Sequence, residues 1–222
     1  MFKHAVWCIC VFALACSSLS SCAEFSNGIK RGVCEPVNTL RSVDFDALEL
    51  ESLAAWVEEH YSIPEADLIE YEHSDGLLEV QWRYSGRVYA AFFEGQSLRS
   101  LGIRPVSNEI RAYQVMKCFG TPDFYGAYVV SSGRQRWYET HLWYPSEGVV
   151  VRYSFVSTTG DSSPSINGYS PVDVIVFRPN SLDKVVVQAY VPGVGFLPSG
   201  WSQHLKPWPG AWEKIELTEL SR

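Results

Sequence analysis

The cysteines are the residues whose chemistry the sequence constrains most closely. Three of the six lie in or directly after an apolar stretch at the N-terminus, and a fourth follows a run of small residues. The full set is Cys8, Cys10, Cys16, Cys22, Cys34 and Cys118. Removal of the N-terminal stretch and acylation of Cys22 would leave Cys34 and Cys118. Two cysteines in an oxidising compartment commonly pair. Cys34 and Cys118 are therefore expected to form a disulfide if the chain is exported, with two separate buried thiols as the alternative.

The N-terminus has the three-part layout of a secretory signal. Lys3 and His4 form a short basic region, Ala5–Ala15 is apolar, and small serines follow. A permanent membrane-spanning helix needs about 20 apolar residues, so this run is too short to be one. The layout predicts a signal peptide over 1–21 that is removed on export.

Cys22 has the sequence context of an acylated cysteine. The segment Leu19-Ser20-Ser21-Cys22 resembles the bacterial lipobox, in which an aliphatic and two small residues precede a cysteine that becomes the lipid-modified N-terminus. Several acyl chains hold a protein on a membrane surface, at about 0.8 kcal/mol per buried methylene. We expect a lipid anchor at Cys22 that attaches the protein to a membrane, either the cell membrane or the outer membrane; cleavage without acylation, giving a secreted protein, is the alternative.

The histidines and glycines do not form a metal or cofactor motif. No pair of histidines or cysteines beyond the leader has the spacing of a metal site, and Gly193-Val194-Gly195 lacks the third glycine of a phosphate-binding loop. Neither a metal nor a cofactor is predicted. His73 and His141 lie beside Glu72 and Glu139 and are expected at the surface or an interface, where they would titrate near neutrality.

The carboxylates offer one route to catalysis. Glu70 and Glu72 would lie on the same face of a strand, at a spacing that suits acid/base chemistry, and Asp123 could join them beside the aromatic C-terminal segment. A solvated strand face is the simpler interpretation. No Gly-x-Ser-x-Gly sequence is present, so serine catalysis has no support.

Three tryptophans near the C-terminus are a candidate binding platform. Trp201, Trp208 and Trp212 alternate with prolines and cannot share one regular helix. Packed as a lid on the sheet, each ring would bury on the order of 150–250 Å². Exposed, the rings would form an apolar surface suited to a glycan or a partner protein in the cell envelope.

The charge excludes one class of partner. The formal net charge is −7, and loss of Lys3 with the leader makes it −8. Nucleic-acid binding needs a concentrated basic face, which the sequence lacks. No nucleic-acid partner is expected.

Periodicity predicts a helix followed by a hairpin, twice. Asp44 or Asp46 could cap a first helix that ends near Tyr61, and strands are expected over 78–84 and 87–93, joined by a turn at Ser85-Gly86. In the second set, Ser107 caps a helix that ends at Phe119. Further strands are expected over 136–144, 149–155, 172–177 and 185–191, with a strand or short helix at 215–220.

Landmarks in the two sets recur at similar spacing. Trp82 and Trp143 are 61 positions apart, and the turn residues Gly86 and Gly148 are 62 apart. The fold class expected is α+β, with two short helices packed on antiparallel sheet. The recurrence indicates either a tandem helix-plus-β-meander duplication or a chance repeat of a common order. The expected segments are a signal peptide (1–21), a polar tether (22–43), a first helix-plus-hairpin unit (44–106), a second helix-plus-sheet unit (107–192) and a Trp/Pro-rich segment (193–222).

One part of the chain resembles a known family. The helix ending in Phe119-Gly120-Thr121-Pro122-Asp123, followed by a strand carrying Trp143-Tyr144, is similar to the SmpA/OmlA (BamE-like) family of small bacterial lipoproteins. The resemblance implies a helix followed by three-stranded antiparallel sheet, a layout shared with the β-lactamase-inhibitor-protein-like fold. It also suggests a place in envelope assembly, although this chain is longer than typical members and ends in the Trp-rich segment.

Together these features favour a non-catalytic, membrane-tethered extracytoplasmic lipoprotein that acts as a binding or envelope-assembly module. A secreted hydrolase of cell-wall or polysaccharide material, acting through Glu70, Glu72 or Asp123, is one alternative. A proteinaceous inhibitor of an extracellular enzyme is the other.

Overall fold

The computed structural model describes residues 30–73, 76–105, 110–132, 135–158, 166–179 and 204–220. Several sequence-based expectations fall outside these residues and are not addressed by the structure. They are the signal peptide over 1–21, acylation of Cys22, the cap at Ser107, the strand over 185–191 and the position of Trp201.

The described strands form one sheet in which β1 to β4 run inward from one edge and β5 to β8 run inward from the other side, so that β4 and β8 meet in the middle. The order is β1-β2-β3-β4-β8-β7-β6-β5-β10, and β9 pairs with β5. Neighbours are antiparallel except β10, which is parallel to β5. The strands are β1 (Ile69–Glu72), β2 (Leu77–Tyr84), β3 (Arg87–Glu94), β4 (Ser97–Pro105), β5 (Phe124–Ser132), β6 (Gln135–Tyr144), β7 (Val149–Thr158), β8 (Asp173–Phe177), β9 (Lys206–Pro207) and β10 (Thr218–Leu220).

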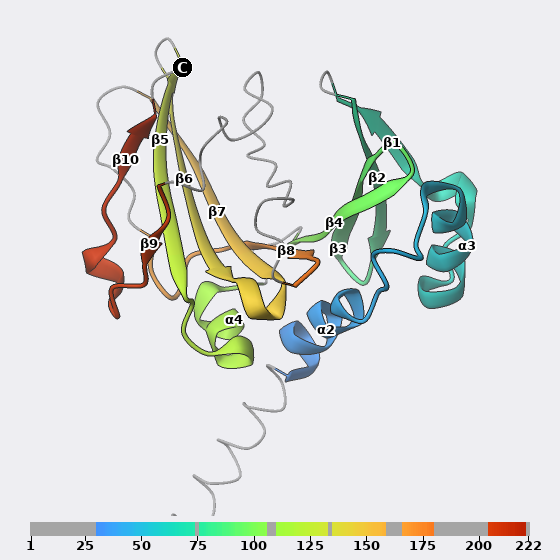
Figure 1. Ribbon diagram of the computed structural model, residues 1–222, viewed down its shortest axis with the longest axis horizontal. Coiled ribbons are helices and arrows are strands. Elements are labelled where there is room, and N and C mark those ends of the chain that lie inside the picture. Colours follow the sequence, from blue (N-terminus) through green and yellow to red (C-terminus); the bar gives the residue numbers. More distant parts are fainter. Residues whose placement is uncertain are drawn as a thin grey trace, which may run out of the picture.

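Three α-helices in the described residues pack on the sheet, so the chain is an α+β protein in which antiparallel sheet dominates. They are α2 (Glu35–Arg41), α3 (Leu50–Tyr61) and α4 (Ala112–Phe119). In Figure 1 the β1–β4 half and the β5–β8 half of the sheet splay apart. Helix α3 lies outside the β1–β4 half, and α2 and α4 lie near the end of the molecule where the two halves come together. The short helical turns are η1 (Lys30–Cys34), η2 (Glu65–Asp67), η3 (Pro145–Glu147) and η6 (Trp212–Lys214).

The core lies between these helices and one face of the sheet. Val37, Leu53 and Val115 from the three helices belong to the same buried cluster as Trp82 on β2 and Leu142 on β6. We call this side the helix face and the opposite side of the strands the strand face. Because side chains alternate along a strand, residues next to the core positions point to the strand face.

Both predicted helices are present, over shorter ranges. The first begins at Leu50 rather than near Asp44, because the backbone carbonyl of Asp44 accepts the N–H groups of Ala47 and Leu48 in a separate turn. Glu49 and Ser52 then form the capping box that starts α3. Helix α4 begins at Ala112, where the Gln114 side chain accepts the Arg111 N–H at 2.8 Å.

The tether predicted over 22–43 is wrong for its C-terminal part, which contains a third helix. Val37 and Leu40, three positions apart on α2, are both fully buried against the core. Two apolar positions in a short polar stretch gave no usable period in the sequence. Tertiary packing, rather than local propensity, therefore stabilises α2.

The hairpin turn predicted at Ser85-Gly86 is confirmed. Both residues have positive φ, 49° and 74°, which is the geometry of a type I′ turn between antiparallel strands. Strands β4 and β5 were not predicted. A bulge at Arg99 within β4 shifts its register against β3, and β5 carries apolar residues on both faces, so neither has a clean alternation.

Candidate functional site

A disulfide joins the two cysteines that lie beyond Cys22. Cys34, directly before α2, is bonded to Cys118 in the last turn of α4, with their Cα atoms 5.5 Å apart. The bond closes a span of 84 residues and fixes α2 to the second half of the sheet. The expectation that these two cysteines pair is confirmed.

The aromatic C-terminal segment packs beside the start of β5. Trp208 and Trp212 are partly buried against the core, and their rings meet edge to face at a centroid distance of 5.2 Å. The backbone N–H of Trp208 donates to the backbone carbonyl of Asp123. Since Trp201 lies outside the described residues, a platform formed by all three tryptophans remains a prediction.

The structure separates the acids considered for catalysis. Glu70 and Glu72 are exposed on β1 at one edge of the sheet, whereas Asp123 immediately precedes β5 near the other edge. The intervening strands keep these carboxyl groups apart. They do not line a common site.

Instead, ionisable side chains gather on the strand face, in what we call the charged row. It crosses the sheet from β2 to β6, and its members come from strands that are neighbours in space but distant in sequence. The residues are Glu79, Arg104, Asp173, Arg152, Glu139 and His141.

Glu79 is the centre of the first part of the row. Its carboxylate lies 3.0 Å from His73 Nε2 and 3.6 Å from the Arg104 guanidinium, and it accepts the Gln81 side-chain amide at 2.6 Å. Only 1% of Glu79 is exposed, although strand alternation predicts a solvated position. Neighbouring donors compensate for the lost hydration of this carboxylate.

Arg152 and Asp173 form the middle of the row. The Arg152 guanidinium donates to Asp173 at 2.6 Å across β7 and β8. Burial by itself lowers the pKa of Arg152, but the carboxylates of Asp173 and Glu139 outweigh this effect and raise it. Arg152 therefore keeps its charge inside the protein.

His141 and Glu139 end the row on β6, and both are fully buried. Glu139 accepts the Ser154 hydroxyl at 2.7 Å, while its second oxygen lies 3.4 Å from His141 Nε2, outside good hydrogen-bond geometry. Burial lowers the pKa of His141, and the nearby Glu139 only partly opposes this. The surface position expected for His141 is wrong, and its imidazole is neutral at pH 7.

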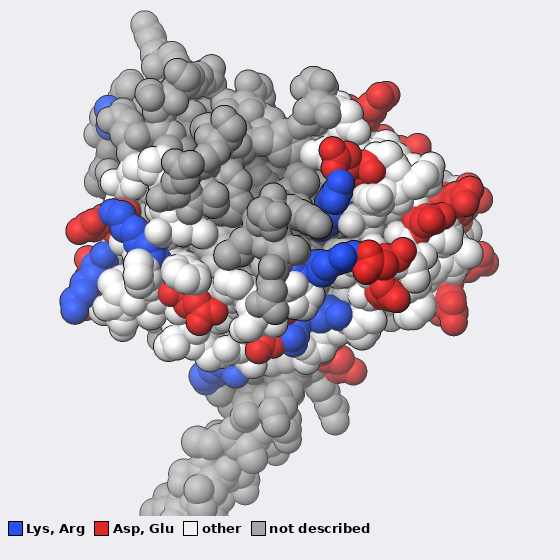
Figure 2. Space-filling view, viewed as in Figure 1, with Lys and Arg blue, Asp and Glu red and all other residues white. Residues whose placement is uncertain are grey.

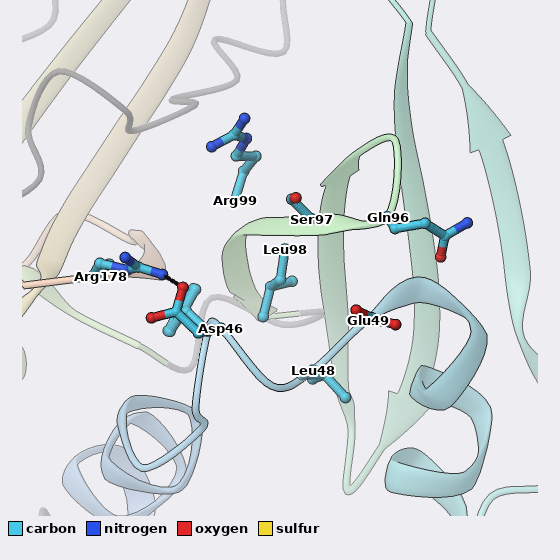
Figure 3. Close-up of a pocket in the computed structure, with 9 residues that line it drawn as sticks. Asp46, Leu48, Glu49, Gln96, Ser97, Leu98, Arg99 and Arg178 are labelled. Atoms are coloured by element: carbon cyan, nitrogen blue, oxygen red, sulfur yellow. Dashed lines mark hydrogen bonds and ion pairs between the residues drawn. The ribbon is translucent and has the colours of Figure 1, made fainter.

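A small polar pocket lies where the α2–α3 connection meets β4 and the end of β8. Its volume is about 250 Å³, and its lining includes Asp46, Glu49, Arg99 and Arg178. Figure 3 shows the Asp46 carboxylate meeting the Arg178 guanidinium, with Arg99 pointing away from that pair. Arg99 is bound to Glu94 instead. Asp46 and Arg178 are thus paired with each other, whereas Arg99 and Glu49 are engaged by groups outside the pocket lining.

Within the described ranges, no helix has the length and apolar character needed to cross a membrane. Among the same residues, no group of three or more His, Cys, Asp or Glu side chains is arranged to hold a metal ion.

No protein-family model, curated protein or solved structure matches this chain.

The charged row was not predicted from the sequence. Glu79 and Arg152 stood out only as polar residues in alternating strands, and such positions normally face water. Their partners lie on strands that become neighbours through the inward order of the sheet. The available signal was the occurrence of acids and arginines at matching strand-face positions, which becomes meaningful once the register is known.

Proposed function

We propose that this chain is an exported lipoprotein, anchored through Cys22, that binds a partner protein of the cell envelope and does not catalyse a reaction. The disulfide between Cys34 and Cys118 carries the proposal. A stable disulfide between the only two cysteines after Cys22 is typical of proteins that reside in an oxidising compartment.

The position of α2 supports a defined orientation on the membrane. The described chain begins at Lys30, at the end of the molecule where α2 and α4 lie together in Figure 1. Cys22 precedes Lys30 by eight residues, which span at most about 29 Å when extended. An anchor at Cys22 would hold the α2–α4 end near the membrane and direct the β1 edge and the strand face away from it.

The charged row supports a structural role for its acids and bases. Glu79, Asp173 and Glu139 each have a hydrogen-bonded or ionic partner, and the His141–Glu139 pair has no exposed surface. A catalytic acid or base must reach a substrate proton. Buried and half-buried groups that engage one another in this way are suited to stabilising the strands on which they lie.

The order of elements supports a tandem duplication. The series α3-β1-β2-β3-β4 is followed by α4-β5-β6-β7-β8, and the two sets meet at β4 and β8 in the centre of the sheet. The landmark pair Trp82 and Trp143 then lies on the second strand of each set, β2 and β6. We propose that two copies of a helix-plus-four-strand unit gave rise to the fold, with α2 and the C-terminal segment added outside them.

A chromosomal deletion tests the binding and assembly role in the native bacterium. We expect the deletion to alter the protein content of the envelope and lower resistance to envelope stress. The wild-type gene should restore both, whereas a Cys22→Ala variant, exported without the anchor, should not. Normal envelope composition and normal stress resistance in the deletion strain would contradict the proposal.

A further inference from the structure

The α3–β1 region is strongly acidic. Between Arg41 and Arg83 the chain has no Lys or Arg and contains 12 of its 25 acidic residues. Figure 2 shows acidic side chains along the side of the molecule where α3 and β1 lie. A surface of one sign attracts partners of the opposite sign and repels copies of itself.

β1 is the edge strand next to this acidic surface. Among the described strands it pairs only with β2, and all four of its residues are exposed. Ile69 and Tyr71 are 47% and 45% exposed, which is unusual for large apolar side chains on a strand. The free side of an edge strand presents backbone N–H and C=O groups that can pair with a further strand.

An apolar groove accompanies this edge. Its volume is about 300 Å³, and it is lined by Ile63, Ile69 and Tyr71 together with Gln81 and Val88 of the neighbouring strands. Register places Ile69 opposite Gln81, so the Ile69 and Tyr71 side chains project to the strand face. The groove therefore lies directly beside the backbone of β1.

Charges around the groove favour a basic occupant. Asp67 lines it, and Glu70 and Glu72 extend from β1 toward the opposite face of the sheet. Arg83 also lines the groove and balances Asp67 there, so the excess of negative charge beside β1 comes from Glu70 and Glu72. A second copy of the chain would place Glu70 and Glu72 against themselves, which opposes self-association through β1.

We infer that the β1 edge binds an extended, basic segment of a partner protein by strand addition; this deepens the binding role proposed above and rests on it. The partner's backbone pairs with β1, its apolar side chains enter the groove beside Tyr71, and alternate Lys or Arg side chains face Glu70 and Glu72. This division follows from the twofold alternation of side chains along paired strands.

A designed peptide tests the inference on the purified full-length chain in neutral detergent. The probe is a fluorescent peptide of about eight residues that alternates lysine with valine, long enough to span β1. The comparisons are a glutamate–valine peptide and a lysine–valine peptide whose backbone amides are N-methylated at alternate residues. Fluorescence anisotropy should show binding of the first peptide at least about tenfold tighter than either of the others.

Matched variants locate the site. Glu70→Lys combined with Glu72→Lys should weaken binding about tenfold, whereas Glu58→Lys combined with Glu59→Lys, an equal charge change at exposed positions of α3, should weaken it by less than about threefold. Tyr71→Ser should weaken it about fivefold with the charge unchanged. Circular dichroism and thermal unfolding should show that each variant remains folded.

Three results would overturn the inference: no binding of the lysine–valine peptide at about 1 mM, equal binding of the N-methylated peptide, or equal losses in the two double-lysine variants. Any of these would leave the proposed anchor and envelope role untouched, because the titration depends on neither. Conversely, an unacylated chain that still binds the peptide would remove the anchor and retain the strand-addition site.

Discussion

At the residue scale, His141 is the side chain whose environment most directly links structure to pH. It lies opposite Arg152 on β7 and Gly126 on β5, with Glu139 3.4 Å away and the Tyr128 and Trp143 rings at 5.8 and 6.1 Å. Burial lowers its pKa in the folded state. The unfolded chain then binds the extra proton more readily, so stability conferred by neutral His141 is complete above the ordinary pKa and is lost as pH falls through the folded one.

Replacing His141 should flatten the pH dependence of stability. Below about pH 6.5, the wild-type free energy of unfolding should fall by up to about 1.4 kcal/mol per pH unit through this one proton. His141→Gln lacks the titrating group and should remove that component, whatever its effect at pH 7. Urea unfolding between pH 5 and 8 measures the difference. His204→Gln, at an exposed position, is the control and should keep the wild-type slope; identical slopes for wild type and His141→Gln would refute this interpretation.

Two strand glycines should respond differently to alanine. A Cβ atom at Gly126 would lie only 2.6 Å from Cζ of the fully buried Tyr128, whereas at Gly102 the nearest atom would be 3.9 Å away. Overpacking of this kind costs about 1–3 kcal/mol, so Gly126→Ala should lower the free energy of unfolding by that amount. Gly102→Ala should leave stability unchanged or raise it by up to about 1 kcal/mol. Chemical denaturation measures the free energy of unfolding of both variants. Equal effects at the two glycines would show that the Tyr128 ring can shift to accommodate the added methyl group.

At the element scale, the disulfide adds a covalent link to the packing that holds α2 on the rest of the molecule. Helix α2 has seven residues, too few to be stable alone in water, and it buries only Val37 and Leu40. The covalent link to α4 restricts the unfolded chain over a long span. It therefore compensates for the small packing area of this helix.

Removing both cysteines should destabilise the protein and release α2 first. Cys34→Ser combined with Cys118→Ser is expected to lower the free energy of unfolding by about 2–5 kcal/mol. Hydrogen exchange should accelerate in α2 more than in β6 or β7, because those strands are paired on both sides. Uniform acceleration across all elements would mean that α2 belongs to the main cooperative unit without the disulfide.

Elements with strong local signals could be predicted, and those defined by distant contacts could not. β2 alternates cleanly and ends in a turn whose residues suit positive φ, so its hairpin was predictable. α2 depends on a disulfide partner 84 residues away, and β4 on a bulge in its pairing with β3. The charged row was harder still to predict from the sequence, because Glu79 and Arg104 come together only when β2, β3 and β4 are neighbours in the sheet.

At the scale of the whole molecule, the strand order gives the sheet two different edges. β1 forms an acidic edge with an apolar groove, and β5 at the other side is covered by β9 and β10. The charged row crosses the central seam between β4 and β8, and the polar pocket lies beside β4 and the end of β8. An anchor near α2 would leave the β1 edge accessible to other envelope proteins.

Intact-mass analysis of the membrane fraction from expressing bacteria tests the central claim most directly. We expect a chain that begins at Cys22, carries the added mass of diacylglycerol or further acyl groups, and retains the Cys34–Cys118 disulfide. The Cys22→Ala chain should lack that mass and leave the membrane fraction. An unmodified wild-type chain found in the soluble fraction would contradict the proposal of a lipid-anchored protein.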